Sequence, residues 1–270
     1  MVSNLLEADI ENVLDAAFAG EDEQLLVVDP SAETIVSLVE AAASRDDLPE
    51  MSMLAAEGTL KDVLDDFLVA SKAADLVAEG ALDLRVLDEA VDNVLLVSPS
   101  RVVALVSTGD RVAALASDDD EFVAEVFGTH GDAFDDADTY GLRTPAISRV
   151  RETMAAEIGE ATREDFDAVL AAIGSADDGS ALDEVAVSLL VAAKNDVLLY
   201  DISKWGEDVG IASKATFSRT KTRLEDLGII DTEKVPIDVG RPRLRLKLGD
   251  ERLQDLDADE VADEVAEMLA

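Results

Sequence analysis

The sequence lacks cysteine and is poor in aromatic residues and in long apolar runs. None of its 270 residues is a cysteine, and aromatic side chains account for 4% of them. Without thiols, neither disulfides nor thiolate metal sites can form. No apolar run reaches the roughly 20 residues that a membrane helix requires, and residues 1–14 lack the basic start and apolar run of a signal peptide. We therefore expect a cytoplasmic protein that does not bind membranes.

Positive charge is scarce as well. The chain has 22 Lys and Arg against 61 Asp and Glu, which gives a formal net charge of -39. The acidic residues recur along the whole length beside Val, Leu and Ala. Evenly spread carboxylates are typical of halophilic cytoplasmic proteins, whose surfaces stay hydrated in molar salt. Because 48% of the residues are apolar, the chain can still bury a substantial core.

The first half of the chain alternates between strand and helix patterns, which predicts an α/β domain over residues 1–140. The predicted strands are 25–28, 51–54, 82–87 and 93–98, followed by a hairpin at 101–117. The predicted helices are 3–19, 31–43, 59–79, 119–137 and 145–158. Ser3 is the expected cap of the first helix, and Gly80 ends the third.

The order of elements in residues 183–248 is helix, short strand, helix, turn, helix and two strands. This order predicts a winged helix-turn-helix domain within 181–250, joined to the first domain by a helical linker at 141–180. Ser213 is placed to cap the third helix. The apolar side of that helix consists of Phe217, Leu224 and Leu227. Its other side is small, polar and basic, as a helix in the major groove of DNA requires.

Residues 213–248 gather the scarce positive charge. They carry nine Lys and Arg against five Asp and Glu, a net charge of +4, whereas the rest of the chain has a net charge of -43. Most basic runs are simply solvated faces, but the other solvated faces of this chain are built from acids. A local positive field attracts double-stranded DNA. The predicted DNA contacts are Lys214, Thr216, Ser218, Arg219, Lys221, Thr222, Arg223, Arg241, Arg243 and Arg245.

The basic residues of the last strand and Lys221 are expected to lie in different surroundings. The strand at 243–248 alternates, so its leucines are expected inside and Arg243, Arg245 and Lys247 outside. Lys221 stands where this class of helix usually has an apolar residue. We expect its stem at the edge of the core and its ammonium outside, within reach of a phosphate.

The last 20 residues, 251–270, have the pattern of an acidic amphipathic helix. The apolar positions are Leu253, Leu256, Val261, Val265 and Leu269. Such a helix can pack on its own chain or form a contact between two copies, and the pattern does not distinguish these arrangements.

Three segments resemble the haloarchaeal transcriptional regulators called TbsP, which are similar to the TrmB-like sugar-sensing regulators. They are "LLVVDPSAETIVSLVE", "RVVALVSTGDRVAALASDD" and "ATFSRTKTRLEDLGIIDTEKVPIDVGRPRLRL", the last being the most specific. The resemblance implies a regulator of central carbon metabolism genes, sugar and gluconeogenic, with a metabolite as effector. TrmB relatives usually carry the DNA-binding module at the N-terminus, whereas here it is C-terminal. We expect a homodimer that reads two half-sites about one helical turn apart.

A site for the effector can be sought at the strand ends of the first domain. Ligands of open α/β sheets bind beyond the carboxyl ends of the strands, and helix N-termini there can receive an anion. The candidate residues for a small anionic metabolite are Asp29, Ser31, Thr59, Ser98, Ser100 and Arg101. Helix capping explains Ser31 and Thr59 equally well, and a salt bridge to a nearby carboxylate explains Arg101.

Motifs for catalysis are absent from the sequence. We find no phosphate loop, no GxGxxG, no nucleophile motif and no cluster of metal ligands, and His130 has no partner histidine. We therefore predict neither an enzyme nor a cofactor or metal site. Two alternatives to a DNA-binding regulator remain open. One is a protein-interaction adaptor of the transcription machinery, and the other is a metabolic enzyme with an appended winged helix.

Overall fold

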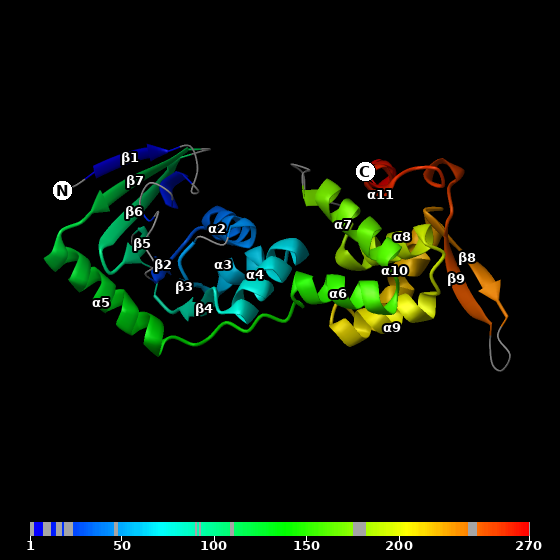
Figure 1. The fold of residues 1–270 in the computed structure, drawn as a ribbon, viewed down its shortest axis with the longest axis horizontal. Helices are drawn as coiled ribbons and strands as arrows, with labels where there is room; N and C mark the ends of the chain where they lie inside the picture. The colour runs from blue at the N-terminus through cyan, green and yellow to red at the C-terminus, as the bar shows by residue number, and fades with distance from the viewer. Residues whose placement is uncertain are drawn as a thin grey trace. The chain divides into compact units, whose positions relative to one another are not determined.

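The chain divides into two compact units, residues 1–142 and 143–270 (Figure 1). The computed structural model describes residues 3–7, 12–14, 18, 24–45, 48–89, 91, 93–108, 111–174, 182–236 and 242–269. None of the helices in these ranges is long and apolar enough to span a membrane.

The first unit is built on a seven-stranded sheet with the order β1-β7-β6-β5-β2-β3-β4. Its strands are β1 (Ser3–Glu7), β2 (Leu25–Val28), β3 (Met51–Ala56), β4 (Leu82–Leu87), β5 (Val94–Ser98), β6 (Arg101–Thr108) and β7 (Arg111–Ser117). β3 runs parallel to both of its neighbours, β2 and β4. In contrast, β5, β6, β7 and β1 are each antiparallel to their neighbours. The sheet is therefore mixed.

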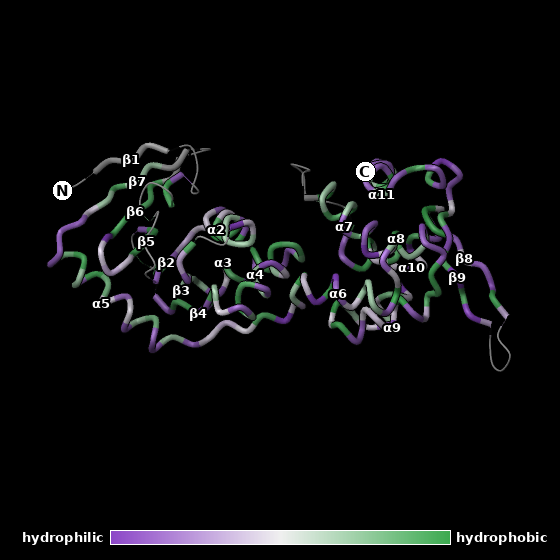
Figure 2. Tube along the Cα trace, viewed as in Figure 1, coloured by the Kyte–Doolittle hydropathy of each residue, from purple (hydrophilic) through white to green (hydrophobic). Residues whose placement is uncertain are grey.

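Helices cover both faces of this sheet. One face carries α2 (Ala32–Ser44), α3 (Glu57–Val63) and α4 (Phe67–Glu79), and the other carries α5 (Asp120–Asp136) (Figure 1). Side chains alternate across a strand, so Leu25 and Val27 pack under α2–α4 while Leu26 and Val28 pack under α5. β6 and β7 are mainly hydrophobic (Figure 2), and two of their apolar side chains, Val106 and Leu115, are each 48% exposed.

Two predictions for this unit are wrong in detail. Residues 3–7 form a strand paired with β7, not the start of a helix capped by Ser3. The open edge of β7 supplies backbone partners, and five residues are too few for periodicity to separate helix from strand. The helix predicted at 59–79 is two helices, because Asp66 caps a new one by accepting a bond from the Val69 amide at 3.0 Å.

The second unit contains helices around a small hairpin. They are α6 (Ile147–Glu157), α7 (Glu160–Gly174), α8 (Glu184–Lys194), α9 (Leu199–Val209), α10 (Lys214–Asp226), the 3-10 turn η1 (Glu251–Leu253) and α11 (Ala258–Leu269). The hairpin pairs β8 (Ile230–Val235) with β9 (Arg243–Leu248). The short strand expected at 197–200 is a single bridge between Leu198 and Arg245. An N-terminal α/β domain and a C-terminal winged helix-turn-helix domain are thus confirmed.

The ends of this unit pack on its own core. α6 and α7, in the stretch predicted as a linker, contact α9 and α8 respectively, and α11 packs against α7. Leu253, Val261 and Val265 are buried there. The apolar face of the last helix therefore has a partner within the chain.

Gly206 allows α9 and α10 to approach closely. A Cβ at this position would lie 2.3 Å from Cζ of Phe217, which is fully buried. Ile202, Trp205 and Val209 share the same buried side of α9, as the helical spacing predicts. The single tryptophan of the chain, Trp205, donates from Nε1 to Oγ1 of Thr153 at 3.0 Å. This contact ties α9 to α6.

Candidate nucleic-acid interface

The helix α10 presents one polar side to solvent. Ser213 caps it by accepting a bond from the Thr216 amide at 3.2 Å, and the Lys214 amide donates to a carboxylate oxygen of Glu207 at 3.4 Å. The exposed positions are Ser218, Arg219, Thr222 and Arg223, and Lys214 and Thr216 are half-buried. Sequence spacing therefore located this surface correctly.

The buried side of α10 differs from the prediction at one position. Phe217 and Leu224 are buried, but Leu227 is 46% exposed because the helix ends at Asp226 and Leu227 is its C-cap. Thr220 takes the third place on the buried side instead. Its spacing, three residues after Phe217 and four before Leu224, fits the helical period.

Most basic side chains of this surface are paired with a carboxylate of the same unit. The pairs are Lys214 with Glu207, Lys221 with Glu225, Arg223 with Asp183, Arg243 with Asp201 and Lys247 with Asp196. The Lys221 side chain is only 13% exposed and its ammonium is held by Glu225, so the structure does not direct it outward as predicted. Hydrogen bonding from Lys214 lowers the pKa of the Glu207 carboxyl.

Arg219 has a different environment from the other cations of α10. Its guanidinium donates to Oγ1 of Thr216 at 3.3 Å, and within the described ranges no carboxylate forms a salt bridge with it. An exposed guanidinium with free donors is suited to bidentate contact with a base or a phosphate. Arg219 is the candidate for base recognition.

Figure 2 colours much of β8 and β9, the strands of the wing, as hydrophilic. Leu246 is fully buried, and Arg243 lies over the ring of Tyr200, 4.6 Å from its centroid. Arg245 departs from the prediction, because its Nε is buried with no hydrogen-bond partner beside the bridge to Leu198. The predicted contact Arg241 lies outside the described residues.

A cavity of about 320 Å³ separates the start of α9 from α10 and β9. Its lining residues are Leu199, Tyr200, Ser203, Lys214, Ser218, Pro242, Arg243 and Leu244. Two cations and three hydroxyl groups from three elements thus line one hollow. This combination suits an anionic group such as a backbone phosphate.

The predicted effector residues do not form one site. Because β5 is antiparallel to β2, Ser98 lies near the start of β2, at the edge of the sheet opposite to Asp29. Ser98 and Ser100 share a hydrogen bond in the turn that leads to Arg101. The reasoning from strand ends assumed parallel neighbours, and the antiparallel pairing overturns it.

Of the remaining predicted effector residues, Ser31 and Asp29 have structural roles. Ser31 caps α2 by accepting from the Thr34 amide at 3.2 Å. Thr59 lies inside α3, which begins at Glu57, and so is not its cap. Asp29, in a left-handed conformation with φ of 48°, accepts a bond from the Val91 amide at 3.1 Å.

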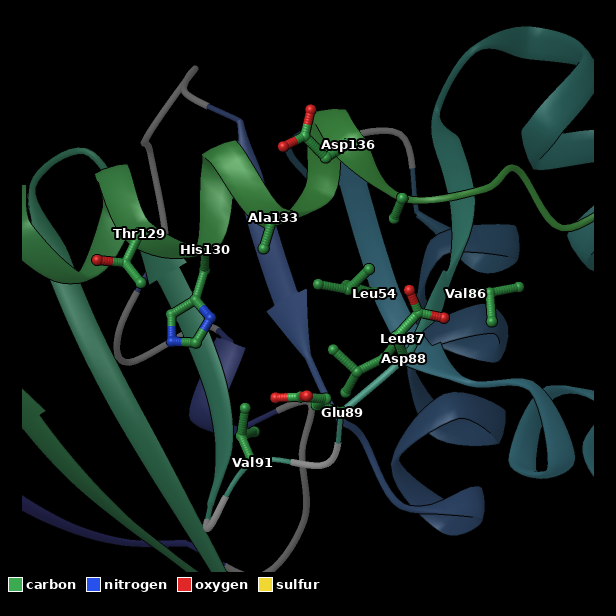
Figure 3. Close-up of a pocket in the computed structure, with 11 residues that line it drawn as sticks. Leu54, Val86, Leu87, Asp88, Glu89, Val91, Thr129, His130, Ala133 and Asp136 are labelled. Carbon is green, nitrogen blue, oxygen red and sulfur yellow. The ribbon is translucent and has the colours of Figure 1, made fainter.

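A different cavity of about 400 Å³ lies between α5 and the carboxyl ends of β3 and β4 (Figure 3). Its lining residues are Leu54, Val86, Leu87, Asp88, Glu89, Val91, Thr129, His130, Ala133, Asp136 and Ala137. The His130 ring points into it towards Glu89, whereas the Asp136 carboxylate points away. Burial lowers the pKa of His130, so the imidazole is neutral at pH 7. Within the described ranges, no three metal-binding side chains gather here or elsewhere.

Sequence reasoning missed this cavity because it considered His130 only as a histidine without a partner histidine. A signal was present in the spacing of α5. His130 follows Val123 by seven residues and precedes Phe134 by four, and both of these are buried under the helix. The same face therefore carries His130 towards the sheet.

An α/β unit followed by a winged helix whose exposed helix and wing carry the basic residues defines a DNA-binding transcriptional regulator. The chain belongs to the TbsP-like transcriptional regulators. The family model described as "Transcriptional regulator TbsP-like, N-terminal" matches residues 2–145, and the one described as "Transcriptional regulator TbsP-like, C-terminal HTH domain" matches residues 146–266. The resemblance to TbsP noted in the sequence is confirmed at the level of the family.

Two solved structures resemble part of the chain weakly. The archaeal chromatin protein TrmBL2, whose structure shows a novel mode of DNA binding, is 19% identical with a TM-score of 0.38, over 52% of this chain and 54% of that one. The chain therefore spans about half the length of TrmBL2. Nuc from Salmonella typhimurium, a phospholipase D family member, is 10% identical with a TM-score of 0.37, over 52% of this chain and 99% of that one. Scores this low carry no argument about function. Among curated proteins no match was found.

Proposed function

We propose that this regulator reads its operator with α10 in the major groove and controls genes of central carbon metabolism, sugar and gluconeogenic. The observation that supports operator reading is Arg219, which is exposed among small polar residues and has no described carboxylate partner. An arginine with free donors pairs with guanine at two points and contributes about 1 to 3 kcal/mol of discrimination. The link to carbon metabolism rests on the TbsP resemblance alone.

The hollow between α9, α10 and β9 is the proposed binding site of a DNA phosphate. Lys214 and Arg243 supply positive charge and Ser218 supplies a hydroxyl donor, whereas the Ser203 hydroxyl already donates to the Tyr200 carbonyl at 3.2 Å. Phosphate contacts of this kind fix the position of a protein on the duplex but do not read its sequence. The site would therefore hold α10 at the right depth for Arg219 to reach base edges.

The regulator is proposed to act as a homodimer in molar salt. Two copies of α10 would then meet successive major grooves about 34 Å apart. The acidic composition supports function in high salt, since the chain carries a formal net charge of -39. Because α11 packs on α7 of its own chain, the dimer contact is expected elsewhere.

The metabolite effector is proposed to bind in the cavity beside His130. Its described lining has no Lys or Arg and includes Asp88 and Glu89, while the carboxylate of Asp136 points away, so a neutral or cationic molecule suits it better than the anion expected from the strand ends. The wall is formed by α5, which leads directly into the segment that joins the two units. Arg85 holds the end of α5 through the carbonyls of Phe134, Asp135 and Ala137. A ligand that moves α5 would thus also move the connecting segment.

The test of DNA binding is a shift assay in molar KCl with genomic fragments recovered by occupancy mapping of the full-length protein. We expect a retarded complex with recovered fragments that excess random DNA does not remove. Equal retardation of all fragments would contradict operator reading, and no retardation would favour the adaptor. Recovered fragments without carbon metabolism genes would refute the assigned targets.

The effector is tested by calorimetry with glucose and with phosphorylated glucose. We expect heat with the neutral sugar only, and none after Ala133→Trp, which fills the cavity. Ala124→Trp is the matched control, since Ala124 is exposed on the same helix and does not line the cavity. Binding of the phosphorylated sugar alone would contradict the proposed charge preference.

A further inference from the structure

Most of the basic side chains proposed to face DNA are already paired with carboxylates of the second unit, and Arg219, which has no described carboxylate partner, is an exception. The joined atoms lie 3.7 Å apart for Arg223 and Asp183, 3.4 Å for Arg243 and Asp201, and 2.8 Å for Lys247 and Asp196. The side chains of these pairs are 40% to 55% exposed. Lys214 and Glu207 form a similar pair, with side chains 43% and 44% exposed. Solvent-exposed pairs of this kind are worth little in stability and separate readily.

Phosphates can compete for these cations. Lys214 and Arg243 both line the hollow where a phosphate is proposed to lie, and each is bound to a carboxylate, Glu207 and Asp201 respectively. When such a cation turns to a phosphate, its former carboxylate is left unpaired next to the negatively charged duplex. Like charges at this distance repel, so the carboxylate needs a new positive partner.

We propose that DNA binding by this surface takes up monovalent cations from solution, which occupy Glu207, Asp201 and Asp183 when their Lys and Arg partners turn to phosphates. The inference rests on the proposed DNA-binding mode of α10 and the wing. Ordinary basic surfaces release counterions from DNA, and the logarithm of the binding constant falls with the logarithm of salt concentration by about 0.9 for each phosphate contacted. Here each carboxylate that captures a cation cancels about one such release.

The consequence is binding that tolerates high salt. A surface with several phosphate contacts would lose orders of magnitude in affinity between dilute and concentrated salt if its cations were free. When the carboxylates exchange their Lys and Arg partners for cations from solution, the affinity for DNA stays nearly constant over that range of salt concentration. The carboxylates beside the cations therefore have a function in DNA binding, and are not merely part of the acidic background.

The experiment measures the operator Kd of the full-length protein over a tenfold range of KCl, and again in potassium glutamate to separate effects of the anion. Glu207→Gln, Asp201→Asn and Asp183→Asn are compared with the wild type singly and together. Glu264→Gln is the matched control, because Glu264 on α11 pairs with Arg252 at 2.8 Å, away from α10 and β9.

For the wild type we expect a salt slope near zero. Each neutralised carboxylate should make the slope more negative by up to about 0.9, which is about eightfold in Kd over the tenfold range. Glu264→Gln should leave it unchanged. A steep wild-type slope, or identical slopes for the wild type and the triple variant, would overturn the inference while leaving operator binding intact. No DNA binding at any salt concentration would overturn the proposed function itself, and this inference with it.

Discussion

Both units contain a cavity of similar volume, but the two cavities differ in charge. The cavity beside α5, about 400 Å³, is lined by Asp88, Glu89 and Asp136 and by no described Lys or Arg. The hollow beside α10, about 320 Å³, is lined by Lys214 and Arg243 and by no described carboxylate. The two cavities are similar in volume, so they are distinguished by the charge of their lining residues. Basic residues are scarce in this chain, 22 against 61 acidic ones. The placement of the few cations determines which unit can bind an anionic polymer.

The largest expected effect comes from reversing the charge at Arg219. Arg219→Glu removes a base contact worth about 1 to 3 kcal/mol and adds repulsion from phosphate, so operator affinity should fall by more than about 100-fold. Shift assays measure the loss, and circular dichroism checks the fold. Lys72→Glu, which makes the same change of charge at an exposed pair with Glu40 in the first unit, should have little effect. Equal losses for both variants would show that net charge, and not position, controls binding.

The next largest effect separates the stabilities of the two units. Gly206→Ala drives a Cβ into the fully buried ring of Phe217, and overpacking of this kind costs about 1 to 3 kcal/mol. Fluorescence of Trp205, the only tryptophan, reports on the second unit and should show its unfolding at lower denaturant concentration. Gly128→Ala in α5 meets no atom within 4 Å and should stabilise the first unit by about 0.5 to 1 kcal/mol. An unchanged midpoint for Gly206→Ala would mean that α9 and α10 do not pack this closely.

The smallest effect is expected in the wing. Replacing Arg241 and Arg243 with Ala should weaken binding to operator and random DNA by the same modest factor, since a wing mostly meets the backbone. Each of the two arginines is expected to contribute about 1 kcal/mol to the free energy of binding. Arg252→Ala, outside α10 and β9, is the control. If operator binding collapsed while binding to random DNA persisted, the wing would be reading bases.

The elements that could be predicted from the sequence are those set by local rules. The cap at Ser213 and the buried positions of α9 depend on residues within one or two turns of each other. The same rules failed for residues 3–7, whose partner β7 lies more than a hundred residues later, and for Leu227, where the helix had already ended. Local patterns do not contain such information.

The candidate sites divide in the same way. The sequence itself determined the order of elements, the outward side of α10 and the gathering of positive charge in residues 213–248. These features follow from helical period, capping and charge, which are properties of neighbouring residues. Only the tertiary structure decided that β5 runs antiparallel, which separates Ser98 from Asp29, and that His130 faces a cavity. It also decided which carboxylate meets which cation, as for Asp183 and Arg223, because such partners come together only when distant segments pack.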